Sequence, residues 1–83
     1  MINKYKAPRG QIVWAVLYDG DNYDEVRELS ATGDLKSLDP IENGNLSVND
    51  IVLLRGQFLV VWDDGDIQIW TESSFNVIFT PVV

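Results

Sequence analysis

The chain has 83 residues, and we expect residues 1–83 to fold as one domain. It contains no histidine and no cysteine, which excludes an imidazole base, a thiolate nucleophile, a disulfide and the usual zinc ligands. Thirteen carboxylates against six basic side chains give a net charge of −7. This charge repels phosphate backbones and argues against direct binding of nucleic acid.

The first ten residues are polar and precede the first predicted strand. They contain half of the basic side chains, namely Lys4, Lys6 and Arg9. We expect a flexible basic arm over residues 1–10, with no apolar stretch typical of a signal peptide. A strand follows over residues 11–18, with apolar residues on both of its faces. Because no apolar run approaches the ~20 residues that cross a membrane, we expect no membrane contact and a cytoplasmic protein.

A short helix is predicted after this strand. Asn22 followed by Glu25 has the spacing of a capping box, and Tyr23, Val26 and Leu29 share one helical face. The turn and helix carry a set of outward acidic residues, which are Asp19, Asp21, Asp24, Glu25 and Glu28. Acidic residues in the first turn also suit the helix dipole.

The rest of the chain predicts short strands joined by tight turns. Hairpin turns are expected at 42–45 and 63–66, because Asn-Gly and Asp-Gly readily take positive φ angles. A loop or single helical turn is expected at 71–74. Strands are expected at residues 35–38, 46–48, 51–54, 57–62, 67–70 and 76–81.

These elements predict an α+β fold that is mostly β. Six or seven short strands would form a curled antiparallel sheet or small barrel, with one short helix after the first strand. One two-turn helix cannot cover a sheet whose strands are apolar on both faces. Either the sheet curls on itself or a second copy of the chain covers it, so a homo-oligomer is one of the two expectations.

The order of these features resembles a group of small phage and prophage proteins named for a Pro-Gly-Asp-Tyr motif. The resemblance is carried by Lys4-Tyr5-Lys6, by AVLYDGDNYDEV at 15–26, by NDIVLLRG at 49–56, by Phe75 and by Pro81-Val82. The Pro-Gly of the motif is replaced by Val48-Asn49, and the hairpin at 57–70 is fuller than in the group. The resemblance implies a β-rich fold and a phage origin, and no particular activity.

The acidic turns lack the spacing of a metal site or a catalytic site. Neither 19–21 nor 63–66 has the sixth-position glycine and twelfth-position glutamate of an EF-hand loop. Carboxylates at loop tips are well solvated, whereas glycosidase chemistry needs one with a raised pKa. For Ser73-Ser74, the sequence offers no candidate base partner other than lysine. We therefore expect no enzymatic activity, no cofactor and no metal.

The tryptophans divide into two groups. Trp14 and Trp62 lie in apolar strands and are expected in the core. Trp70 borders a loop, and if it is exposed it would be a candidate hot spot for binding another protein.

A binding role is thus the main expectation. We expect the chain to inhibit a host protein with a basic surface, such as a nucleic-acid-handling defence enzyme, by imitating phosphate charge. The residues expected to make contact are Asp19, Asp21, Asp24, Glu25, Glu28, Asp63, Asp64, Asp66 and Trp70. One alternative is a structural or assembly protein of the virion. Another is a binder of a small nucleotide signal that stacks on Trp70 or Tyr18 and holds phosphate with the N-terminal basic residues.

Overall fold

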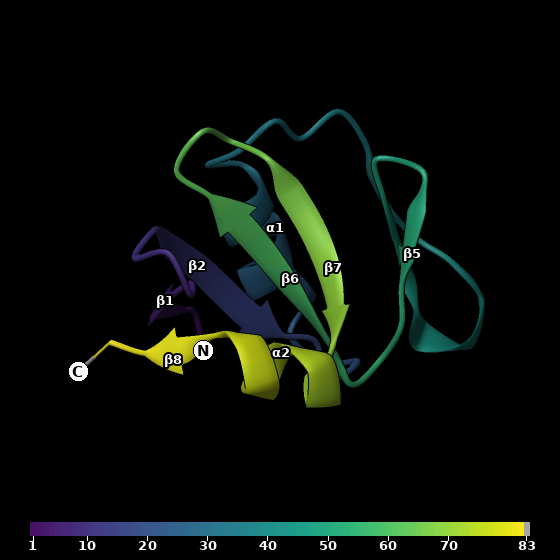
Figure 1. Cartoon of the computed structure of the whole chain (residues 1–83). Helices are drawn as coiled ribbons and strands as arrows, with labels where there is room; N and C mark the ends of the chain where they lie inside the picture. Colours follow the sequence, from purple (N-terminus) through teal and green to yellow (C-terminus); the bar gives the residue numbers. More distant parts are fainter. Residues whose placement is uncertain (83) are drawn as a thin grey trace.

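An antiparallel sheet of five strands forms the centre of the molecule (Figure 1). The computed structural model describes residues 1–82. The strand order is β7-β6-β2-β1-β8, with β1 at Asn3–Lys6, β2 at Ile12–Leu17, β6 at Gln57–Trp62, β7 at Ile67–Thr71 and β8 at Thr80–Pro81. A smaller antiparallel sheet has the order β3-β4-β5, with β3 at Leu38–Pro40, β4 at Leu46–Val48 and β5 at Ile51–Leu53.

Two helices cover the two faces of the central sheet. Helix α1, at Tyr23–Ser30, buries Val26 and Leu29 on one face, where the small sheet also packs. Helix α2, at Glu72–Ile78, lies on the other face and buries Phe75. Strands β2 and β6 are therefore enclosed on both sides, which is why both of their faces are apolar.

Helix α2 corrects the expectation of a single helix, and it shortens the strand expected at 76–81 to β8 at Thr80–Pro81. The Thr71 hydroxyl accepts a hydrogen bond from the Ser74 amide at 3.3 Å and caps the first turn. Phe75 and Phe79, one helical turn apart, stack with ring centroids 4.7 Å apart. Because α2 covers the second face, the sheet neither closes into a barrel nor needs a second chain there.

The expected N-terminal arm is also corrected. Residues 3–6 form β1, which pairs with β2 on one side and with β8 on the other. Lys4 and Lys6 point to solvent, whereas Tyr5 is half-buried and its ring lies 4.8 Å from that of Phe75. The alternation of charged and aromatic residues at Lys4-Tyr5-Lys6 is typical of a strand with one face on the core.

The small sheet confirms the predicted turn at 42–45. Asn43 and Gly44 have φ angles of 63° and 75°, and β3 and β4 pair across this turn. The strand expected at 35–38 instead begins at Leu38. Asn49 causes this shift, because its side-chain oxygen accepts hydrogen bonds from the amides of Lys36 at 2.6 Å and Ser37 at 3.1 Å. Those amides are therefore held in a loop.

Candidate protein-binding surface

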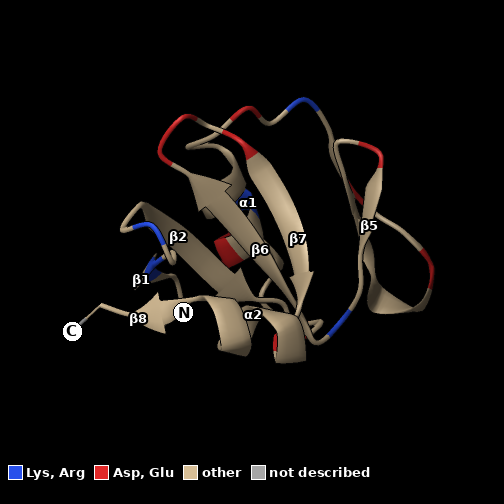
Figure 2. Cartoon of the chain, viewed as in Figure 1, with Lys and Arg blue, Asp and Glu red and all other residues tan. Residues whose placement is uncertain are grey.

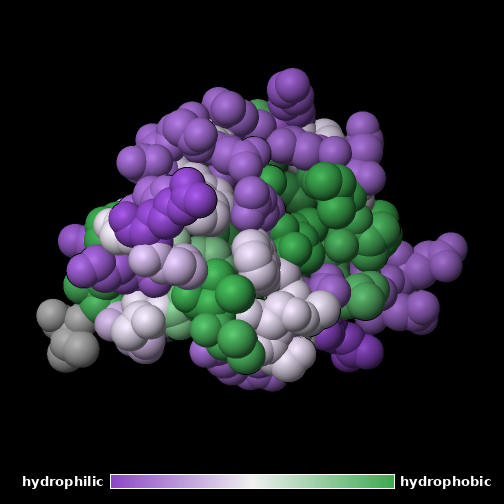
Figure 3. Space-filling view, in the orientation of Figure 1, coloured by the Kyte–Doolittle hydropathy of each residue, from purple (hydrophilic) through white to green (hydrophobic). Residues whose placement is uncertain are grey.

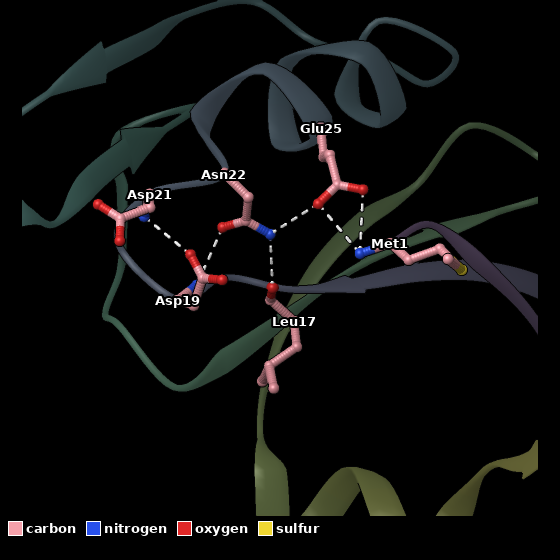
Figure 4. Close-up of polar contacts among 6 residues, drawn as sticks. All are labelled: Met1, Leu17, Asp19, Asp21, Asn22 and Glu25. Atoms are coloured by element: carbon pink, nitrogen blue, oxygen red, sulfur yellow. Dashed lines mark hydrogen bonds and ion pairs between the residues drawn. The ribbon is translucent and has the colours of Figure 1, made fainter.

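The acidic turn before α1 is held by its own side chains (Figure 4). The Asn22 side chain accepts a hydrogen bond from the Asp19 amide at 3.0 Å and donates one to the Leu17 carbonyl at 2.8 Å. The Asp19 carboxylate accepts a hydrogen bond from the Asp21 amide at 2.8 Å. The helix thus begins where the sequence predicts, but the expected capping box does not form, because Asn22 faces the turn and makes no cap bond to the helix.

Glu25 is the most constrained carboxylate of this group. Its oxygens lie 2.9 and 3.0 Å from the Met1 ammonium, and one of them accepts a hydrogen bond from the Asn22 side chain at 3.2 Å. The hydrogen bond from the ammonium, followed by the one from Asn22, lowers the pKa of Glu25 below its ordinary value. The Glu25 carboxylate is therefore partly neutralised by partners within the chain, and it is less available to another protein than the carboxylates without such partners.

No other carboxylate among the described residues has a charged partner of this kind. Among residues 1–82, the pair of Met1 and Glu25 is the one ion pair within 4.0 Å. No lysine or arginine side chain in this part of the chain pairs with a carboxylate. Asp24 and Glu28 are exposed and lie one turn apart on the outer face of α1. Their charges are consequently available to a partner.

The hairpin tip is the second acidic group, and the structure places it away from the first. The β2–β6 register pairs Leu17 with Phe58 at one end and Val13 with Trp62 at the other. Asp19 and Asp21 follow the first end, whereas Asp63, Asp64 and Asp66 follow the second end. Figure 2 shows the charged segments of the hairpin and of α1 separately. The predicted acidic residues therefore do not form one cluster.

Helix α1 connects the two acidic groups. Its eight residues span about 12 Å, from the acidic turn toward the far end of the sheet. Just beyond the helix, the Asp34 amide donates a hydrogen bond to the Gly65 carbonyl at 2.8 Å, which fixes this loop to the hairpin tip. We use the name acidic band for the exposed carboxylates of the turn, of α1, of this loop and of the hairpin tip, which are Asp21, Asp24, Glu28, Asp34, Asp63 and Asp64.

Trp70 is half-buried, on the face that carries α2. Its indole N–H donates to the Gln68 side chain at 3.0 Å, and its ring lies 5.1 Å from that of Phe79, edge to face. The ring borders a shallow groove of about 460 Å³, whose other walls belong to α2: Ser73, Ser74, Val77 and Ile78. These four wall residues were not among the expected contacts, because the sequence predicted at most a single helical turn at 71–74, whereas α2 extends to Ile78. The Thr71 cap and the phenylalanine spacing were the signals for that helix.

Three further aromatic residues bear on the expectations, and Trp14 is the one that differs plainly. Trp14 is not a core residue, since it is 45% exposed, with the Lys4 ammonium 5.8 Å from its ring. Trp62 packs against Phe79 and is half-buried. Tyr18 is only 2% exposed, and its hydroxyl donates to the Gly44 carbonyl at 2.6 Å. Burial raises the pKa of Tyr18, and the ring has no free face on which a nucleotide could stack.

Within residues 1–82, no three acidic side chains gather as a group that could hold a metal ion. No helix in the same range combines the length and the apolar character needed to cross a membrane. Comparison of the chain with family models, curated proteins and solved structures gives no match.

Proposed function

We propose that this chain is a small non-enzymatic phage protein that binds a basic surface on a host protein and inhibits it. The observation that carries the proposal is the unpaired charge of the acidic band. A net charge of −7 is spread over a small domain in which, through residue 82, no lysine or arginine forms an ion pair. A nucleic-acid-handling enzyme, whose groove attracts phosphates, is the partner class that such a surface fits.

The position of the carboxylates supports this binding mode. Asp24 and Glu28 stand on a helix whose opposite face is buried in the core, so their spacing is fixed before any partner arrives. A preformed row of charges steers association. Because the helix is already ordered, its backbone loses little conformational entropy on binding. The hairpin tip extends the row at the far end of the helix.

The test is a charge reversal with a matched control. We expect Asp24→Lys combined with Glu28→Lys to weaken binding to purified basic host nucleases by at least about tenfold. The control reverses Asp39 of β3 and Glu42 of the turn that follows it. Both are exposed, and their reversal changes the net charge by the same amount. Binding should also weaken with added salt and compete with duplex DNA. Equal effects from both variants, or binding insensitive to salt, would refute the proposal.

A role in virion assembly is the second candidate, because the small sheet exposes apolar side chains. Ile51, Val52 and Leu54 are 56%, 48% and 45% exposed. Exposed neighbouring apolar residues are typical of subunit contacts. Sedimentation velocity distinguishes the two candidates: concentration-dependent assembly that Val52→Asp abolishes favours the virion role, and a monomer at all concentrations favours the inhibitor.

A further inference from the structure

Strand β7 forms one edge of the central sheet. It pairs with β6, and in residues 1–82 no other backbone or side chain hydrogen-bonds the main chain of Ile67 or Ile69. Figure 1 shows β7 at the front of the sheet, with β6 on one side and the separate small sheet beyond its other side. This edge is one place where another extended chain could add to the fold.

The direction of the free groups follows from the register. The Trp62 amide donates to the Asp66 carbonyl at 2.9 Å, so Asp66 turns its backbone toward β6. Since hydrogen-bonded and non-hydrogen-bonded positions alternate in an antiparallel pair, Gln68 and Trp70 also face β6. Ile67 and Ile69 therefore direct their N–H and C=O groups outward.

This edge lacks the usual protection against added strands. Strand β7 has five residues, IQIWT, without a charge or a proline. The opposite edge, β8, has only two residues, one of which is Pro81. Natural sheets block their edges with short strands, charges or prolines, so β8 is protected and β7 is not.

Both faces beside this edge are partly apolar. On the α2 face, the groove bounded by Trp70, Val77 and Ile78 lies at the end of β7. On the α1 face, Ile67 and Ile69 are half-buried against the core. Figure 3 shows apolar side chains over the region between β7 and β5. A strand added to β7 would find apolar contacts for its side chains on both faces.

The charges at the two ends of β7 decide which strand fits. Asp66 precedes the strand and Glu72 follows it. If a second copy paired antiparallel about Ile69, Asp66 of each copy would lie opposite Glu72 of the other, in a chain that already carries −7. A basic partner reverses the sign of both contacts.

We propose that β7 accepts, as an added strand, an extended apolar segment of a partner protein that carries lysine or arginine at both ends. The inference rests on the proposed function, because it specifies how a basic partner would be held. Main-chain hydrogen bonds to Ile67 and Ile69 would supply affinity, the groove beside Trp70 would take one side chain, and Asp66 and Glu72 would select the basic flanks.

Amide hydrogen exchange with a defined probe tests the proposal. The probe is acetyl-Lys-Lys-Thr-Val-Thr-Val-Thr-Lys-Lys-amide, with two controls: glutamates in place of the lysines, and proline in place of the central threonine. In the free protein, the Ile67 and Ile69 amides should exchange faster than those of Gln68 and Trp70. The basic probe should slow the first two by at least about tenfold, with a Kd below about 1 mM, and the controls should not.

Three results would overturn the inference. They are slow exchange at Ile67 and Ile69 in the free protein, no protection by the basic probe at millimolar concentration, and equal binding of the proline control. Ile67→Pro, which removes an outward N–H, should abolish probe binding, and the Gln68 and Trp70 amides report whether the β6–β7 pair remains folded. If a basic host protein binds Ile67→Pro normally but not the Asp24/Glu28 reversal, the strand inference fails and the proposed function stands.

Discussion

Replacing Phe75 with leucine tests whether α2 is the cover of the second sheet face. Phe75 is fully buried, and its ring contacts three others: Phe58 at 3.9 Å, Phe79 at 4.7 Å and Tyr5 at 4.8 Å between centroids. Aromatic pairs contribute about 0.5–1.5 kcal/mol each beyond their burial, and contributions at one shared ring add incompletely. We therefore expect a loss of about 2–3 kcal/mol.

The loss is measurable because the domain is small. A chain of 83 residues has a free energy of unfolding of about 4–12 kcal/mol, so the variant still folds at room temperature. Thermal and urea unfolding should show a Tm lower by about 10–20 °C. The matched control is Val77→Ala on the same helix, where the side chain is 82% exposed and the change should stay within about 0.5 kcal/mol. If both variants lose equally little, α2 does not pack as described.

Three other predictions concern single side chains. The Ser30 hydroxyl is buried without a hydrogen-bond partner, so Ser30→Ala should raise the free energy of unfolding in urea by about 1 kcal/mol. Asn49→Ala should cost about 2 kcal/mol by the same assay, since it removes the hydrogen bonds to the 34–37 loop at a φ of 51°, and Asn49→Gly should cost less because glycine accepts that angle. The lowered pKa of Glu25 stabilises the fold above the ordinary carboxyl pKa, and this contribution is lost as the pH falls through the folded pKa. Glu25→Gln should therefore unfold with a weaker dependence on acidic pH, and an unchanged dependence would contradict the ion pair.

The turns were predictable from sequence, because they depend on a few adjacent residues. Asn43-Gly44 takes positive φ, and so does Gly65, as Asn-Gly and Asp-Gly pairs favour. The strands at β2 and β6 followed from apolar runs that only a doubly covered strand tolerates. Which elements cover those strands depends on tertiary packing between distant segments, and the local sequence pattern does not determine it.

The errors share a physical cause. The segment at 76–81 has the residues of a strand, yet Phe75 and Phe79 gain more by packing together on the sheet, so 72–78 is helical. Trp14 has the residue type of a core position but is exposed, and it does not belong to the core cluster that includes Val16 of the same strand. The acidic residues were expected to be contact residues because of their charge. Their separation into two groups, at opposite ends of the sheet, depends on the β2–β6 register.

The acidic charge of the chain and the open edge at β7 are physically linked. An uncharged, unpaired strand such as β7 promotes association between copies unless something opposes it. In this chain, electrostatic repulsion opposes such pairing. Asp66 and Glu72 at the ends of β7, together with the acidic band, would repel a second copy that carries the same charge. The same repulsion becomes attraction for a basic chain. If β7 accepts an added strand as we propose, the negative charge would both oppose pairing between two copies and select a basic partner.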